Sequence, residues 1–312
     1  RLPFKSRWNS YDFGEYNKYG RPDLLTVSYS KDVTFEGVKT TNSLLMLAPI
    51  SNNCGRIIFR NCEMSLAPGA IITSSADGIH LGSNRFGVII DNCEFGNSFD
   101  DLINTQTYSG EITKIINDYT YETSRDMFCS VGDEIKFFNT SNHEIVGTAF
   151  LKEIEKKEDG GYRLTVDRKV YKVLSQETSN TPTSMYNLDS ANKGNIIKNS
   201  TFKNSRRHAY IIRSACSIVE NNIMENNSGA ALEAANEIHG TSNEGLVPSA
   251  LTFRNNTVSG EGISSKYVPL KIYSWNAQLG EQACIDGVLI ENNTIDVPSM
   301  YGSININSVT GL

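Results

Sequence analysis

The sequence predicts an all-β chain that folds as a right-handed parallel β-helix with a small antiparallel β-barrel inserted into it. Three observations support this fold class: an eight-residue phrase recurs along the chain, most copies lie about one solenoid coil apart, and one interval is far longer. Recurrence at intervals of 20 to 50 residues is typical of solenoids, in which each repeat buries its apolar face against its neighbours.

The repeated phrase is a short β-branched run, a charged residue, an asparagine and a return to apolar residues. Its copies begin at Ile57, Val88, Asn195, Ser217, Leu251 and Val288, and a looser copy from Lys31 has Gly37 at the asparagine position. Alternation at period two predicts strands with one buried face. Asparagine tolerates the left-handed backbone of a sharp corner and can bond its stacked neighbours. A β-sandwich, the alternative, would show hairpin turns at closer spacing.

The interval between the second and third marker asparagines predicts the insertion. The markers stand at 61, 92, 199, 221, 255 and 292, so the steps are 31, 107, 22, 34 and 37 residues. The long step contains alternating segments such as GDEIKFF and GYRLTVDRKVY, separated by polar turn clusters that indicate antiparallel hairpins. We therefore expect β-helix coils over 1–106 and 192–312, forming one continuous solenoid, and the inserted barrel over 107–191.

Composition excludes several classes of protein. The 312 residues include 29 basic and 35 acidic side chains, a net charge of −6, and the isoelectric point near 5.4 argues against nucleic-acid binding. No apolar run is long enough for a transmembrane helix. The chain opens Arg1-Leu2-Pro3 without an apolar signal core, so we expect a secreted or periplasmic bacterial protein whose export signal has been removed.

The cysteines indicate packing rather than metal binding. The six cysteines form no CxxC pair, which disfavours zinc ribbons and thioredoxin-type sites. Cys62 and Cys93 each follow a marker asparagine, so we expect them to stack as small buried side chains without a disulfide.

Three acids on consecutive coils are the candidate catalytic residues. Asp77 precedes Asp100 and Asp101 by 23 and 24 residues, about one coil. Adjacent coils lie about 4.8 Å apart, so the three carboxylates should meet on one wall and raise at least one pKa. Neighbouring residues of a strand point in opposite directions, so both Asp100 and Asp101 can face water only if the chain bends there. We expect the cluster to open to solvent.

Further residues are candidates for substrate binding. Asn104 follows the aspartate pair and could donate to a substrate hydroxyl. The Arg206-Arg207-His208 triplet occupies the next coil once the insertion is removed, where guanidinium groups would offset the carboxylates and contact hydroxyls; a solvated basic corner is the alternative. The remaining candidates lie in an apolar run, in a loop and beside Asp77: Glu233, Glu244 and His80.

The sequence resembles glycoside hydrolase family 110, the β-helical α-galactosidases that act on terminal α-1,3-linked galactose. The resemblance rests on ADGIH, on NCEFGNSFDDLIN, and on a barrel with a GDEIKF-type strand followed by an arginine-containing coil that ends in IVENNIM. It runs from about Arg21 to Asn293. Family 28 polygalacturonases share the DG…DD spacing, and His208 stands where that family places a histidine, whereas the inserted barrel favours family 110.

The resemblance implies an inverting glycoside hydrolase acting on galactose-containing glycans or polysaccharides, without a metal or other cofactor. It suggests that Asp100 and Asp101 hold the attacking water while Asp77 tunes them; Glu233, Glu244 or a barrel acid would be the general acid. We expect a carbohydrate partner, no membrane insertion, no nucleic acid and a possible homo-oligomer.

Two other functions remain open. A polysaccharide lyase or uronate epimerase would bind Ca²⁺ with the three aspartates. A non-catalytic carbohydrate-binding β-helix would use aromatic residues such as Tyr267, Tyr273 and Trp275 as a platform.

Overall fold

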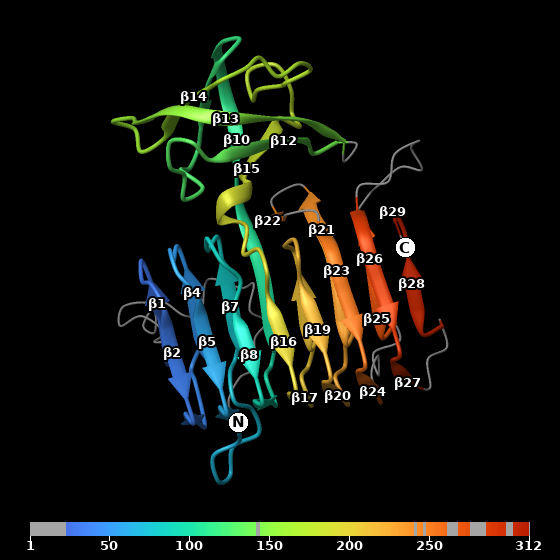
Figure 1. Ribbon diagram of the computed structural model, residues 1–312. Coiled ribbons are helices and arrows are strands. Elements are labelled where there is room, and N and C mark those ends of the chain that lie inside the picture. Colours follow the sequence, from blue (N-terminus) through green and yellow to red (C-terminus); the bar gives the residue numbers. More distant parts are fainter. Residues whose placement is uncertain are drawn as a thin grey trace.

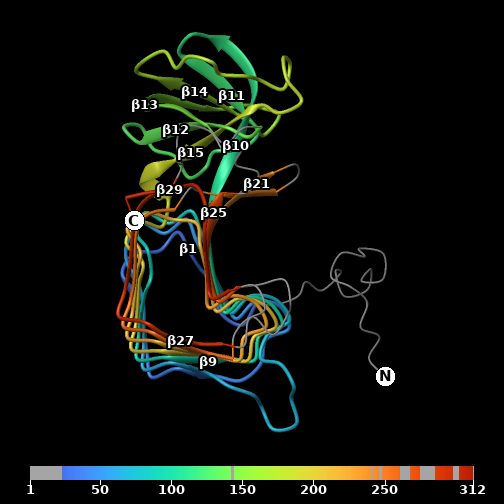
Figure 2. The same ribbon diagram turned by 90° about the vertical axis from the view of Figure 1, so that its right-hand side faces the viewer.

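The chain forms a three-sided tube of stacked coils that carries a separate barrel on one corner (Figures 1 and 2). The computed structural model describes residues 23–141, 144–239, 242–245, 248–260, 268–274, 285–297 and 302–311. Three parallel sheets, called here sheets A, B and C, form the sides. Each coil contributes one strand to sheets A, B and C in that order, and the last described coil contributes strands to sheets A and B. The predicted parallel β-helix is thereby confirmed.

The strands of the tube are short, as the repeat predicts. Sheet A contains β1 (Val27–Ser28), β4 (Ala48–Ser51), β7 (Ile79–Gly82), β10 (Ile103–Asn117), β18 (Tyr210–Ile212), β21 (Leu232–His239), β25 (Leu270–Ser274) and β28 (Ile304–Ile306). Sheet B contains β2 (Val33–Glu36), β5 (Ile57–Arg60), β8 (Ile89–Asp91), β16 (Ile196–Lys198), β19 (Ile218–Glu220), β23 (Ser249–Arg254), β26 (Ile285–Glu291) and β29 (Val309–Thr310). Sheet C contains β3 (Lys39–Thr40), β6 (Glu63–Met64), β9 (Glu94–Gly96), β17 (Thr201–Lys203), β20 (Ile223–Glu225), β24 (Thr257–Ser259) and β27 (Thr294–Asp296).

Each copy of the repeated phrase is a strand of sheet B, a corner and a strand of sheet C. The marker asparagines occupy the corners with φ between 52° and 56°, and Gly37 has φ of 65° at the same place in the first coil. A left-handed backbone costs asparagine and glycine less than other residues, which explains the recurrence. The predicted role of the marker is confirmed.

A second ladder runs inside the tube at the residue after each marker. Asn256 is its clearest member: its side chain donates to Val219 O at 2.9 Å and accepts from the Asn222 backbone N–H at 2.9 Å. Towards the first coils Cys93 and Cys62 take this position, and the Cys62 backbone N–H approaches Cys93 Sγ at 3.4 Å. The two buried thiols therefore stack as predicted, and burial raises the pKa of Cys93 to about 12.

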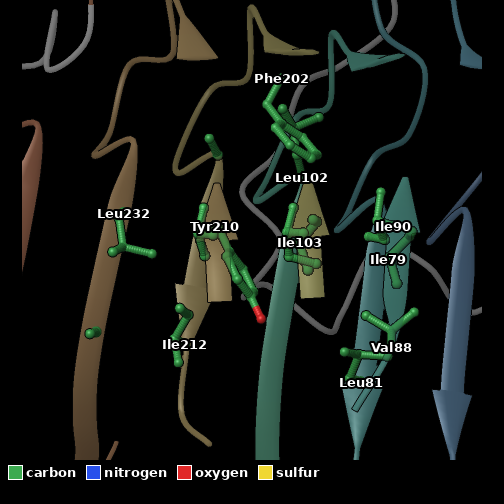
Figure 3. Close-up of a cluster of buried hydrophobic side chains, with 14 of the residues drawn as sticks. Ile79, Leu81, Val88, Ile90, Leu102, Ile103, Phe202, Tyr210, Ile212 and Leu232 are labelled. Carbon is green, nitrogen blue, oxygen red and sulfur yellow. The ribbon is translucent and has the colours of Figure 1, made fainter. Parts of the chain in front are cut away.

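The inward side chains of sheet A form one wall of the core. Ile79, Ile103, Tyr210 and Leu232 come from four successive coils and lie side by side, fully buried (Figure 3). Burying each such side chain contributes roughly 1.5–3 kcal/mol. Because side chains alternate along a strand, the next residue of each strand points out of the tube, and these outward residues build the site described below.

The insertion is a closed antiparallel barrel, as predicted. β10 runs out of the tube and continues into the barrel, where it pairs with β11 (Thr120–Thr123) and β15 (Thr183–Asn187). The ring is completed by β14 (Tyr162–Val166), β13 (Ile145–Lys156) and β12 (Glu134–Asn139). The barrel has its own core, which includes Phe137 and Leu164. A 3-10 turn, η2 (Leu188–Ser190), leads back to the tube.

Two features of the fold bear on the site. Strand β22 (Ser242–Gly245) lies antiparallel to both β10 and β21 (Figure 1), the same two strands that β18 pairs with in parallel. The loop between β6 and β7 projects beyond the corner where sheet C turns into sheet A (Figure 2). No helix within the described ranges has the length and apolar character needed to cross a membrane.

Candidate active site

The three candidate catalytic aspartates converge on the outer side of sheet A. Each comes directly before a strand, Asp77 before β7 and the Asp100–Asp101 pair before β10, and one oxygen of each lies within 4.8 Å of the others. The backbone N–H of Gly78 donates to Asp101 O at 2.8 Å, which stacks the two coils. A Cβ at Gly78 would lie 2.5 Å from Leu102 O, so this close approach requires the glycine of the Asp-Gly motif.

The expected bend at the aspartate pair is present, but the expected opening to water is not. The chain bends at Phe99 and Asp100, so that both carboxylates lie on the same side. The exposed fractions are nevertheless only 2% for Asp77, 3% for Asp100 and 1% for Asp101. Contacts with neighbouring side chains cover this surface, and sequence spacing alone could not reveal them.

Arg207 covers the aspartate pair. Its NH1 lies 3.4 Å from Asp100 Oδ1 and its Nε lies 4.0 Å from Asp101 Oδ1. Burial, followed by the charge of Asp77, raises the pKa of Asp101 well above its usual range, although Arg207 and the His208 backbone N–H oppose the shift. The cluster therefore holds a proton more readily than an isolated aspartate does.

Asp77 is oriented by two neighbours on the same face. His80 Nδ1 lies 2.6 Å from Asp77 Oδ2, and the Asn104 amide donates to the same oxygen at 3.2 Å. His80 and Asn104 are register partners on β7 and β10. On its other side His80 Nε2 lies 2.7 Å from Gln106 Nε2, so Gln106 fixes the imidazole ring.

The same network continues to Glu244 through a buried arginine. Arg213, at the end of β18, donates from NH1 to Asn104 Oδ1 at 2.7 Å and pairs with Glu244 Oε2 at 3.1 Å. Glu244, half-exposed on β22, thus contacts the cluster only indirectly.

His208 and Glu233 form a second buried polar group next to the cluster. The His208 backbone N–H donates to Asp101 Oδ1 at 3.0 Å, and its Nδ1 accepts from the Ala230 backbone N–H at 2.8 Å. Its Nε2 lies 3.6 Å from Glu233 Oε2, and the Tyr273 hydroxyl donates to Glu233 Oε1 at 2.8 Å. Burial lowers the pKa of His208 well below its usual value, so the ring is neutral at neutral pH.

Two expectations for the surroundings need correction. Arg206 does not contact the carboxylates: its guanidinium lies over the Phe99 ring, 4.8 Å from the centroid, and donates to Phe99 O at 3.3 Å. Tyr273 is buried against Glu233 and beneath Lys271 Nζ, 3.8 Å from the ring centroid, so it is no open aromatic platform. Tyr267 and Trp275 lie outside the described residues.

Sequence reasoning missed both Arg213 and Gln106 as site residues. An arginine inside the apolar run YIIRSA is the available signal for Arg213, because a buried arginine requires acceptors. Gln106 carries no comparable signal.

The three aspartates also have the geometry of a cation site. Oxygens bound to one Ca²⁺ at about 2.3–2.6 Å lie at most about 5 Å apart, and the cluster satisfies this limit. In the part of the chain that the structure describes, these three are the residues that could hold a metal.

The chain is similar to three curated proteins, each named alpha-1,3-galactosidase B. It is 24% identical over 255 residues to the protein of Akkermansia muciniphila, a match covering 75% of this chain and 30% of the relative. The corresponding values are 23% over 330 residues for Phocaeicola vulgatus (94% and 53%) and 22% over 256 residues for Parabacteroides distasonis (73% and 39%). The chain thus spans at most about half the length of these relatives.

No protein-family model matches the chain. Among solved structures, the tailspike protein gp49 from Pseudomonas phage LKA1 aligns with 84% of this chain and 50% of its own, at 11% identity and a TM-score of 0.25. A similarity of that size carries no argument about fold or function.

Proposed function

We propose that this chain is a glycoside hydrolase that releases terminal α-1,3-linked galactose from a glycan with inversion of configuration, as in family 110. The observation that carries the proposal is the convergence of Asp77, Asp100 and Asp101 within 4.8 Å on one face of sheet A. The names of the three relatives support galactose as the sugar. An exported enzyme acting on extracellular glycans fits this activity.

The acid cluster is the proton donor in this proposal. Inverting hydrolysis needs one protonated carboxyl at the leaving oxygen and one carboxylate at the water. The raised pKa of Asp101 favours its protonated form and thus the acid role. This differs from the role suggested by the resemblance, in which Asp100 and Asp101 together hold the water.

Glu233 is the proposed base on the other side of the sugar. Register pairs Asn104 with Ile211 and Ile211 with Glu233, so Glu233 lies two coils from Asn104 on the same outward row. Two coils place Glu233 about 9.6 Å along the tube axis from the coil that carries Asn104 and the Asp100–Asp101 pair. Inverting enzymes hold their two carboxyl groups about 6.5–9.5 Å apart, which leaves room for a water. The Tyr273 hydroxyl donates to Glu233 Oε1 at 2.8 Å and holds this carboxyl in position.

Arg207 controls access to the cluster. Its distances of 3.4 and 4.0 Å to the two carboxylates are longer than the roughly 2.7–2.9 Å of a tight charge-assisted hydrogen bond. A substrate hydroxyl that replaces one of these contacts would uncover an Asp101 oxygen and also receive the guanidinium as a donor. Binding is therefore proposed to exchange carboxylate contacts of Arg207 for sugar contacts.

The test is release of free galactose from α-1,3-galactosyl-lactose by wild type, Asp101→Asn and Glu233→Gln, with retention of fold checked by circular dichroism. We expect both variants to lose at least about 100-fold in kcat/KM. The proton donor matters less when the leaving group is a weak base, so Asp101→Asn should lose far less on a dinitrophenyl galactoside than Glu233→Gln does. Asp91→Asn, which alters an acid on sheet B, is the matched control and should keep full activity.

A Ca²⁺-dependent polysaccharide lyase or epimerase is the second candidate, favoured by the cation-compatible geometry of the cluster. It predicts an ultraviolet-absorbing unsaturated or an epimerised uronate product and loss of activity with a chelator. Turnover of polygalacturonate with these properties, and none of galactosides, would replace the hydrolase proposal.

A further inference from the structure

A groove lies at the corner where sheet C turns into sheet A, immediately beside the acid cluster. It has a volume of about 500 Å³. The projecting loop between β6 and β7 supplies Ile71 at one wall, and the next coils supply Phe99 and Arg206. A volume of this size is in the range of ligand-binding clefts.

The groove and the acid cluster share a chain turn. Ser98 and Phe99 line the groove, and the next residue, Asp100, belongs to the cluster; its backbone N–H donates to Ser98 Oγ at 3.1 Å. One coil further on, Arg206 stacks on Phe99 whereas Arg207 contacts Asp100. On both coils, therefore, one residue lines the groove and the next residue in the chain belongs to the acid cluster or contacts it.

A row of amides lines the groove. Asn97, Asn204 and Asn226 stand on three successive coils, linked by the stacking of their backbones, and have φ of 62°, 58° and 58°. Coils repeat at about 4.8 Å, so the row presents donors and acceptors at a regular spacing. No hydrogen bond between described residues uses these three side-chain amides.

The aromatic surface in the groove is accessible. Phe99 is 37% exposed although Arg206 lies over its ring, and Ile71 is 76% exposed. An aromatic face beside amides and a guanidinium is suited to a saccharide, whose C–H faces pack on rings while its hydroxyls bond to amides. Lipids and apolar peptides would leave the amides and Arg206 unsatisfied.

We propose that this groove, defined by Ile71, Asn97, Phe99, Asn204, Arg206 and Asn226, binds the saccharide that leaves when the terminal galactose is cleaved off. The inference rests on the proposed function for the direction of the substrate, with galactose at the acid cluster and the remainder of the glycan along the corner. In this proposal Arg206, which lies over the Phe99 ring and not on the carboxylates, binds the leaving saccharide.

The first test compares kcat/KM for α-1,3-galactosyl-lactose with kcat/KM for 4-nitrophenyl α-galactoside, whose leaving group is too small to fill the groove. Phe99→Ala should lower the ratio of the two about five- to tenfold, since loss of one aromatic contact is worth up to roughly one decade in affinity. Phe150→Ala is the matched control: Phe150 is 42% exposed and lies under Arg168 at 5.6 Å, but on the barrel. It should leave the ratio unchanged.

A second pair of variants tests the amides without straining the backbone. Asn204→Gly removes the side chain and keeps a residue that tolerates φ of 58°, and Asn221→Gly does the same at φ of 56° on the opposite corner. The first should lower the ratio about threefold and the second should not. If neither Phe99→Ala nor Asn204→Gly changes the ratio of the two kcat/KM values, the proposed saccharide site in the groove is wrong, whereas the proposed hydrolase activity is unaffected.

Direct binding separates the groove from the activity. Titration calorimetry with lactose, the leaving saccharide alone, should show weak binding to the wild type that Phe99→Ala reduces and Phe150→Ala does not. If no galactoside is hydrolysed but lactose binds in this Phe99-dependent way, the groove stands and the hydrolase fails. If lactose does not bind, or if both phenylalanine variants weaken it equally, the groove proposal is wrong.

Discussion

Asp101→Asn should stabilise the folded protein while it removes activity. The substitution keeps the shape of the side chain and an oxygen that can accept from the His208 backbone N–H, but it removes a charge from a cluster of three acids. At 4.8 Å and an effective dielectric constant of 20, each ionised acid pair repels by about 3.5 kcal/mol. Attraction to Arg207 and protonation of the cluster offset part of this, so we expect a net gain of about 1–3 kcal/mol at pH 7.

The gain should depend on pH in a definite direction. The pKa of Asp101 is raised in the folded state, so between the unfolded pKa near 3.8 and the folded pKa the folded state binds more protons. Wild-type stability from this group therefore falls as the pH rises through that window, whereas the asparagine variant has no such loss. Urea unfolding at pH 4 and pH 7 should give equal stabilities at the lower pH and a more stable variant at the higher one.

Thermal unfolding provides the same comparison, with an expected rise of about 2–6 °C at pH 7. The control, Asp91→Asn, should not gain stability, because Asp91 accepts from Asn199 at 2.9 Å and pairs with Lys198 at 3.5 Å. An Asp101→Asn protein that is less stable than wild type at pH 7 would refute the electrostatic reasoning, since the carboxylate would then be needed for folding.

Three further outcomes follow from buried polar groups. The pKa of His208 is lowered in the folded state, so the contribution of this residue to folding stability is present above the unfolded pKa near 6.5 and is lost as the pH falls below it. His208→Gln should therefore reduce the loss of stability, measured by urea unfolding, between pH 7 and pH 5. Asn256→Ala should cost about 2–4 kcal/mol in the same assay, because it leaves a buried N–H and C=O of the interior ladder unpaired. Arg213→Met should lower kcat about tenfold or more by releasing Asn104 and Glu244, and unchanged kinetics would show that this network does not orient the site.

The fold was predictable because the repeat contains two independent signals for it. The marker asparagine identifies the corner between sheets B and C, and the apolar alternation identifies the strands on both sides of it. The 107-residue step revealed the insertion, since hairpin patterns could not belong to a coil. The interior ladder at Asn222, Asn256 and Asn293 was less visible, because cysteine and serine replace asparagine in the first coils.

For the site, the sequence predicted which residues come close along the solenoid axis but not where their side chains point. One-coil spacing brought Asp77 next to Asp101, as stacking geometry requires. Spacing does not encode side-chain direction at bends, so it placed Arg206 and Arg207 together although they point to different surfaces. Burial likewise depends on which long side chains fold over the cluster.

The stereochemistry of the first product tests the central claim most directly, namely that the acid cluster and Glu233 act from opposite sides of the scissile bond. Proton NMR during hydrolysis of α-1,3-galactosyl-lactose should show β-galactose first, with the α anomer appearing only through mutarotation. Appearance of α-galactose first would mean that a carboxyl within the cluster attacks the sugar, and it would contradict the proposed pairing of Asp101 with Glu233.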